Sequence, residues 1–270
     1  SRSTGTDGLY LMMLSIHGLL RGTDPELGRD PDTGGQITYV LELAKALGEH
    51  HDVGRVDLVT RRIEDPRVDE IYSKPVEELA EGVRIVRFRF GPKRYIRKEK
   101  LWPHVDALVD RILKHIRAQG RIPDIIHGHY ADAGYVGAQL ARLLGIPFIF
   151  TGHSLGRVKR ARLLEKGKSP ESIERQYNMT RRINAEETAL QTAAMVVTST
   201  TQEQEEQYAL YDQYEPKLMR VIPPGVDLSR FRPPTWPVRH SPIRDELYRF
   251  LEDPGKQMVL TISRADERKN

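Results

Sequence analysis

The sequence predicts an α/β fold in which helices cover both faces of one doubly wound, mostly parallel, Rossmann-like β-sheet. Short runs of β-branched and aliphatic residues alternate with segments of helical periodicity along most of the chain, which is typical of a parallel sheet. Some of these runs, such as residues 147–150, are almost continuously apolar, which indicates strands buried on both faces. Right-handed crossovers would then place a ligand cleft at the carboxyl ends of the strands.

The individual elements follow from these patterns. Short β-branched or aliphatic runs predict strands over residues 9–16, 56–60, 83–90, 124–127, 148–151, 195–198, 219–222 and 258–263. Between them, helical periodicity predicts helices over residues 37–49, 101–119, 133–144, 170–193, 201–208 and 243–252.

Two segments interrupt this alternation. Residues 17–35 form a long loop rich in glycine and aspartate, and loops of this length in compact domains are usually functional or disordered. Residues 223–242 contain six of the chain's 17 prolines, which is typical of a stiff connector between domains. We therefore expect one Rossmann-like domain over residues 1–240. Residues 241–270 would then be a linker and the first strand of a second, truncated domain.

The bulk composition is that of a soluble globular protein, with 39% hydrophobic and 30% charged residues. No apolar run approaches the roughly 20 residues that span a bilayer, so we expect no membrane partner. The absence of cysteine removes thiolate chemistry and favours a reducing, cytoplasmic location. The net charge of +4 suits an anionic ligand. Nucleic acid is a poor alternative, because the chain has no recognition motif, aromatic platform or zinc-finger spacing.

The first candidate binding motif is the segment 32–36, Asp-Thr-Gly-Gly-Gln, between a predicted strand and a predicted helix. Gly34 and Gly35 would let the backbone approach a ligand, and the helix after them offers free N–H groups to a phosphate. An ordinary tight turn explains the same residues equally well. The motif is not the G-x-G-x-x-G fingerprint, which counts against a nicotinamide dehydrogenase.

The second motif, His-Gly-His-Tyr-Ala-Asp over residues 127–132, ends a predicted strand, where polar side chains point into the cleft. His127 and His129 lie on one face, but no third metal ligand is near in sequence, so we expect no metal site. Asp132 could cap the helix that follows, meet a sugar hydroxyl, or do both.

The third motif, residues 151–159, is predicted to be a polar loop after a strand, and it carries His153, Ser154 and Lys159. A histidine can bind a sugar hydroxyl or a phosphate, and a lysine offers a compact positive charge. A histidine at a strand end is also often only structural. The neighbouring serine, arginine and lysine favour a binding loop here.

A dispersed set of cations could hold a phosphate monoester, which needs more than one positive charge. The candidates are Lys98, Lys159, Arg181 and Arg182, although solvated surface positions explain any one of them by composition alone. Adjacent helical residues point about 100° apart. Only one of the two arginines should therefore face the cleft, and the other should pair with Glu186 or with solvent.

The chain ends on a further basic segment, residues 263–270. Arg264 and Lys269 follow the last predicted strand and could clamp a diphosphate. A plain polar loop explains them equally well.

In this order and topology, the motifs resemble those of retaining glycosyltransferases with two facing Rossmann domains, the GT-B fold of glycosyltransferase family 4. The general marks of that group are residues 32–36, 222–227 and 263–270. Three further segments are similar to sucrose-phosphate synthases, and their counterparts in sucrose synthases differ: residues 98–103, 129–132 and 151–156. The resemblance runs from about residue 9 to residue 270.

This resemblance implies the acceptor-binding half of an enzyme that transfers glucose from UDP-glucose to fructose 6-phosphate, with retention, giving sucrose 6-phosphate and UDP. The departing diphosphate would help to deprotonate the attacking hydroxyl, so the paired carboxylates of glycosidases are not needed. Catalysis would require positioning and charge stabilisation on the leaving diphosphate. No cofactor is implied. ADP-glucose as donor and stimulation by Mg²⁺ stay open.

The resemblance also implies roles for single residues. Gly34, Gly35, Gln36 and Ser154 would line the donor and acceptor cleft. Lys98, Lys159 and one of Arg181 and Arg182 would hold the 6-phosphate. His129, Asp132 and His153 would contact sugar hydroxyls at the reacting centre, with His153 assisting the transfer. Arg264 and Lys269 would neutralise the departing diphosphate.

Two alternatives remain at this point. One is a transferase of the same architecture with another acceptor, including a sucrose synthase, which takes unphosphorylated fructose. The other is a non-catalytic phosphosugar-binding module. We expect the chain by itself to bind fructose 6-phosphate weakly or not at all and to turn over nothing, because the donor-binding partner domain is missing from it.

Overall fold

The computed structural model describes residues 8–229, 231–232 and 242–257. The chain divides into two units, residues 1–223 and residues 224–270. Within the described part of the second unit lies one helix, α7 (Pro242–Tyr248). The predicted domain boundary at residue 240, the predicted strand over 258–263, Arg264 and Lys269 lie outside the described residues.

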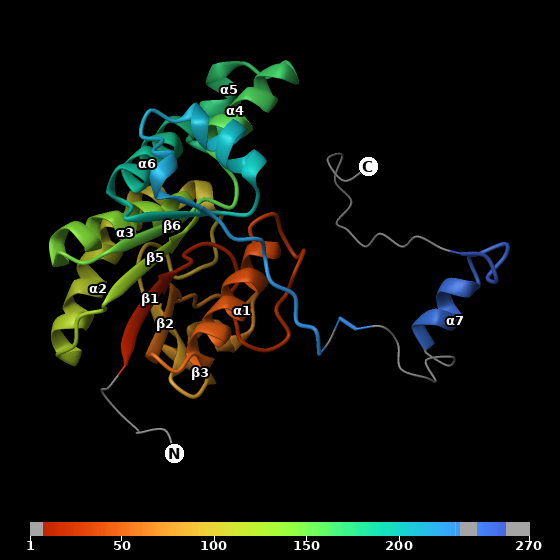
Figure 1. Ribbon diagram of the computed structural model, residues 1–270, viewed down its shortest axis with the longest axis horizontal. Coiled ribbons are helices and arrows are strands. Elements are labelled where there is room, and N and C mark those ends of the chain that lie inside the picture. Colours follow the sequence, from red (N-terminus) through yellow and green to blue (C-terminus); the bar gives the residue numbers. More distant parts are fainter. Residues whose placement is uncertain (1–7, 230, 233–241, 258–270) are drawn as a thin grey trace. The chain divides into compact units, whose positions relative to one another are not determined.

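The first unit is built on one eight-stranded sheet with the strand order β3-β4-β2-β1-β5-β6-β7-β8 (Figure 1). Its strands are β1 (Leu9–Leu14), β2 (Val53–Arg61), β3 (Val76–Ala80), β4 (Val83–Phe88), β5 (Ile125–His129), β6 (Phe148–Thr151), β7 (Met195–Thr198) and β8 (Met219–Val221). Every neighbouring pair is parallel except β3–β4, which is antiparallel. The predicted doubly wound, mostly parallel sheet is confirmed.

The direction of winding reverses between β1 and β5. From β1 the chain builds outward through β2 and β4, then returns to place β5 on the other side of β1. Leu14 pairs with Gly128, and His129 pairs with Thr151, so β1, β5 and β6 end at the same edge. In open α/β sheets, ligands bind at such a reversal, outside the carboxyl ends of the strands.

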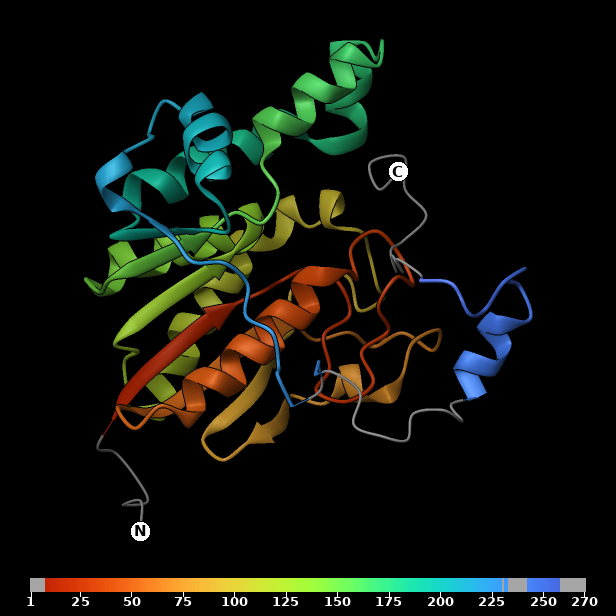
Figure 2. The same ribbon diagram turned by 45° about the vertical axis from the view of Figure 1, so that its right-hand side comes forward.

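Helices cover both faces of this sheet (Figure 2). They are α1 (Gly35–Glu49), α2 (Val105–Gln119), α3 (Tyr130–Leu144), α4 (Gly156–Glu165), α5 (Pro170–Tyr177) and α6 (Met179–Thr192). Helix α1 shares one buried cluster with Met13 and Leu58, whereas α2, α3 and α6 share the larger cluster on the opposite face. Helix α2 buries residues 105, 108, 109, 112 and 116, the spacing of an amphipathic helix.

Several predicted elements need correction. Strand β3 was not predicted, because this short edge strand is polar and alternately exposed. The expected helix over 170–193 is two helices, since Asn178 adopts the left-handed conformation (φ 47°) between α5 and α6. The expected helix over 201–208 is largely a π turn, Glu203–Gln207.

The largest correction concerns helix α4 (Gly156–Glu165), which was not predicted and whose first residues belong to the expected loop over residues 151–159. Only Gly156 of this helix is buried, so it has no apolar stripe from which helical periodicity could be read. Among the described residues, no helix combines the length and the apolar character that crossing a membrane requires.

Candidate active site

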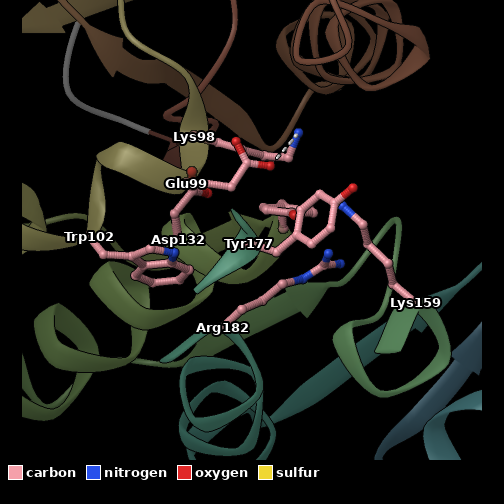
Figure 3. A pocket seen from close by; sticks show the side chains of 8 residues that line it. Lys98, Glu99, Trp102, Asp132, Lys159, Tyr177 and Arg182 are labelled. Carbon is pink, nitrogen blue, oxygen red and sulfur yellow. Dashed lines mark ion pairs between the residues drawn. The ribbon is translucent and has the colours of Figure 1, made fainter. Parts of the chain in front are cut away.

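The polar motifs meet in one small pocket near the carboxyl ends of β1, β5 and β6 (Figure 3). The pocket is lined by Lys98, Glu99, Trp102, Tyr130, Asp132, Lys159, Tyr177 and Arg182. These side chains come from the short helical turns before α2, from the start of α3, and from α4, α5 and α6. Only the folded topology brings these segments together.

Three of the four predicted cations line this pocket: Lys98, Lys159 and Arg182. Arg181 does not, because it is exposed and its guanidinium lies 5.0 Å from the centre of the Tyr135 ring. One arginine of the adjacent pair therefore faces the cleft, as predicted. Of the two outcomes expected for the other arginine, Arg181 shows exposure to solvent, and the arginine bound to Glu186 (Nε–Oε1, 3.0 Å) is the pocket residue Arg182.

The three cations differ in their partners. The ammonium of Lys98 pairs with the carboxylate of Asp32 and lies 3.8 Å from Glu99. Although burial alone would raise the pKa of Asp32, the charge of Lys98 holds it below its usual range. Lys159 makes no ion pair within the described residues, and its Nζ lies 3.8 Å from the centre of the Tyr177 ring.

Lys159 is the pocket cation that no carboxylate of the described residues neutralises. Burial, followed by the like charges of Arg182 and Lys98, lowers its pKa to about 8. A phosphate bound beside Lys159 would instead raise this pKa, because a nearby negative charge stabilises the protonated amine. The pocket thus has the electrostatic character of a site for a negatively charged group.

Two carboxylates, Glu99 and Asp132, also line the pocket. Asp132 is not the N-cap of α3, because His129 holds that position and Asp132 lies in the first turn. Its carboxylate accepts a hydrogen bond from the Ala133 N–H (2.7 Å) and contacts His17 Nδ1 (2.9 Å). The pocket therefore offers cations for a phosphate and carboxylate oxygens for hydroxyl groups.

Beside the pocket, three histidines gather at the ends of β5 and β6. His129 Nδ1 lies 3.0 Å from His153 Nε2, and His127 Nε2 lies 2.8 Å from Thr151 Oγ1. Burial lowers the pKa of His127 and of His153 to about 3 and that of His129 well below its usual value. These imidazoles are therefore neutral at physiological pH and can donate and accept hydrogen bonds without carrying charge.

His127 and His129 were also weighed as metal ligands. Within the described part of the chain, the one group of three potential ligand residues is His50, His51 and Asp52, which is exposed. Residues 127 and 129 do not belong to it. His129 Nε2 is buried and has no hydrogen-bond partner among the described residues.

Two non-glycine residues at the site have positive φ angles, Tyr130 (φ 77°) and His153 (φ 57°). The left-handed conformation costs such side chains roughly 1–2 kcal/mol each. It persists where packing and hydrogen bonds determine the position, and it is concentrated at functional sites. Here it aims Tyr130 into the pocket and His153 toward His129.

The glycine motif lies at the same edge. Gly34 precedes α1, which has neither a side-chain N-cap bond nor an acidic residue in its first turn. A Cβ added at Gly34 or Gly35 would meet nothing within 4 Å. Gln36 donates from Nε2 to Ser15 Oγ (3.2 Å). The N–H groups of this helix start are therefore open to a ligand.

Ser154 has an indirect place at the site. Its side chain is exposed, and both its carbonyl oxygen (2.5 Å) and its Oγ (3.3 Å) accept hydrogen bonds from Arg182 Nη2. It thus holds the pocket arginine rather than lining the pocket.

Some residues of the site were not predicted from the sequence. Glu99, Trp102, Tyr130 and Tyr177 line the pocket, and His17 holds Asp132. Glu99 directly follows Lys98, and Trp102 lies four residues after it, and this closeness in sequence was the available signal for both. Nothing in the sequence around Tyr177 distinguishes it from other surface aromatics.

The chain is similar in sequence to known proteins. The sequence model of Glycosyltransferase Family 4 matches residues 33–230. Probable sucrose-phosphate synthase 2 and sucrose-phosphate synthase 4 of Arabidopsis thaliana are 41% and 42% identical over 97% of the chain. The chain spans 30% and 31% of their lengths.

The fold is also similar to that of a solved structure. A sucrose-phosphate synthase from Thermosynechococcus elongatus matches with a TM-score of 0.63 and 30% identity, over 83% of this chain and 50% of that one. The chain has the Rossmann-like fold of the N-terminal half of a GT-B glycosyltransferase, and it belongs to glycosyltransferase family 4.

Proposed function

We propose that this chain is the acceptor-binding half of a sucrose-phosphate synthase, which transfers glucose from UDP-glucose to fructose 6-phosphate with retention. The observation that carries the proposal is the meeting of Lys98, Lys159 and Arg182 in one pocket. A phosphate monoester has nearly two negative charges near neutrality and three acceptor oxygens, so it requires several such donors. The similarity to sucrose-phosphate synthases over 97% of the chain supports this acceptor.

The neighbouring groups suit the rest of such a substrate. Glu99 and Asp132 would accept hydrogen bonds from sugar hydroxyls, and His129 and His153 would lie at the reacting centre as neutral imidazoles. The start of α1 at Gly34 and Gly35 would face the donor diphosphate. Arg264 and Lys269, which lie outside the described residues, would bind the donor diphosphate. Catalysis would then come from positioning and from stabilising charge on the leaving group.

The whole reaction needs a donor-binding half as well. No cofactor enters the proposed reaction, ADP-glucose is an alternative donor, and stimulation by Mg²⁺ is to be measured. A cytoplasmic location belongs to the same proposal.

The acceptor is tested by ligand-observed NMR titration, which detects weak binding. Wild-type chain should bind fructose 6-phosphate at least about tenfold more tightly than fructose. Arg182→Ala should remove this preference, while Arg181→Ala, its exposed sequence neighbour, should keep it. Equal binding of the two sugars, or equal effects of the two substitutions, would contradict the proposal.

One observation favours a second acceptor class. Lys98 is already compensated by Asp32 and Glu99, which reduces the net charge available to a phosphate. A sucrose synthase, whose acceptor is unphosphorylated fructose, would need less positive charge in this pocket. Tighter binding of fructose than of fructose 6-phosphate in the same titration would favour this alternative.

A further inference from the structure

Glu186 is buried beside the pocket residue Arg182 and does not itself line the pocket. Its carboxylate accepts hydrogen bonds from Arg182 Nε (3.0 Å), from the Gly156 N–H (3.0 and 3.1 Å) and from the Tyr211 hydroxyl. Burying a carboxylate costs free energy of desolvation, and removing it would leave three buried donors without an acceptor. The three contacts therefore show what this carboxylate positions.

The first of these contacts concerns Arg182. Glu186 occupies Nε, and Ser154 occupies Nη2, so the guanidinium is held in the plane that these two partners define. Within the described residues Nη1 makes no hydrogen bond, and in Figure 3 the Arg182 head group lies among the other lining side chains. An arginine fixed at two nitrogens binds an anion with less loss of side-chain entropy.

The other contacts concern helix α4, which carries Lys159. Its preceding residue, Leu155, supplies no side-chain cap. Instead, Glu186 accepts the first free N–H, that of Gly156, and Tyr211 accepts the second, that of Arg157, at 3.1 Å. A carboxylate at this position also complements the helix dipole. Gly156 is the one fully buried residue of helix α4, whose Val158 and Leu163 also pack against the core, so this distant cap contributes to where the helix begins.

From these contacts we propose that Glu186 is the positioning residue of the pocket, because it sets Arg182 directly and Lys159 through the start of α4. The inference rests on the proposed function, since it assumes that these cations bind the phosphate group of the acceptor. It goes beyond that function by assigning two of the three pocket cations to one buried carboxylate that does not touch the ligand.

The test uses Glu186→Gln, which keeps the shape and removes the charge, and Tyr211→Phe as a milder variant that keeps the buried ring. Glu42→Gln is the control, because Glu42 is an exposed glutamate of α1 that pairs with Lys45 and does not line the pocket. Glu186→Asp tests for rescue of the charge.

The first readout is amide hydrogen exchange at Gly156 and Arg157, which needs no ligand. Exchange should become faster in Glu186→Gln, partly faster in Tyr211→Phe, and stay unchanged in Glu42→Gln. Unchanged exchange in the folded Glu186→Gln and Tyr211→Phe variants would overturn the inference.

The second readout is affinity for fructose 6-phosphate. It should fall about tenfold in Glu186→Gln, less in Tyr211→Phe, and partly return in Glu186→Asp. In an Arg182→Ala background the effect of Glu186→Gln should be markedly smaller, whereas a general structural role would give additive effects. If exchange responds as expected but wild type prefers fructose, the proposed function fails and the positioning of α4 stands.

Discussion

The carboxylate of Asp32 binds Lys98 twice, accepting a hydrogen bond from its backbone N–H at 2.9 Å and pairing with its ammonium. This contact ties the long loop after β1 to the helical turn before α2, across 66 residues of sequence. Asp32 is 4% exposed, so the pair is shielded from solvent. One interaction therefore places both the glycine-backed start of α1 and the first cation of the pocket.

Replacement of Asp32 by alanine should lower the free energy of unfolding by about 2–3 kcal/mol, because it leaves a partly buried ammonium and an N–H without their acceptor. Urea denaturation measures this difference. Glu42→Ala is the control, since it breaks the exposed Glu42–Lys45 pair and should cost at most about 0.5 kcal/mol. Similar losses in both variants would contradict the structural role of Asp32.

The two glycines at the start of α1, Gly34 and Gly35, should be dispensable for folding and important for ligand binding. Gly34→Ala and Gly35→Ala introduce a Cβ into open space, so the free energy of unfolding should change by no more than about 1 kcal/mol. UDP-glucose or fructose 6-phosphate bound against this backbone would meet the new methyl group, and NMR titration should show weaker binding.

Gly18→Ala is the matched control for folding. Gly18 has a φ of +80°, and a Cβ there would lie 2.4 Å from the Asp32 carbonyl oxygen, so this variant should be strongly destabilised. If Gly34→Ala and Gly35→Ala bind ligands as wild type does, the glycine motif is only a turn.

The neutral histidines predict loss of stability in mild acid. Burial depresses the pKa of His153 to about 3, so the unfolded chain binds its proton first, near pH 6.5. The stabilisation is complete above that pH and is lost as the pH falls below it, by about 1.4 kcal/mol per pH unit for one histidine.

His153→Asn should remove that share of the pH dependence between pH 6.5 and 5, and asparagine tolerates the positive φ at this position. Chemical denaturation at several pH values measures it. His51→Asn, at a side chain that is 83% exposed, should leave the slope unchanged. An identical slope in His153→Asn and wild type would show that His153 is charged in the folded protein.

Lys159 predicts a pH dependence of binding in the alkaline range. Its pKa of about 8 in the free protein means that the cation is lost as the pH rises through 8. Affinity for fructose 6-phosphate should therefore fall by several-fold between pH 7 and about pH 9, while the charge of the phosphate stays constant. Lys159→Arg should bind with little change over this range, because arginine keeps its charge.

The exposed Lys114 provides the control for this measurement. Lys114→Arg should retain the wild-type decline between pH 7 and pH 9. A flat profile in wild type would mean that Lys159 either stays charged or does not contact the phosphate.

Local pattern was sufficient for most of the fold. Strands β1 and β6 are largely apolar runs with side chains buried on both faces, and α2 repeats buried residues every three or four positions, so their class can be read from neighbours in sequence. Strand β3 and helix α4 lack such a pattern, because Gly156 is the one fully buried residue in the two elements. Helix α4 also lacks a local cap, since Glu186 and Tyr211 supply it from a distance.

By itself, then, the sequence determined the α/β class, the glycine loop at a strand end, and a set of cations that could bind an anion. These depend on residue type and on spacing along the chain. Tertiary structure decided that Arg182 rather than Arg181 faces the pocket, that Asp32 compensates Lys98, and that Tyr177 and Glu99 complete the lining. Such relationships arise from how separate helices cross at one sheet edge, and that geometry has no signature in any single stretch of sequence.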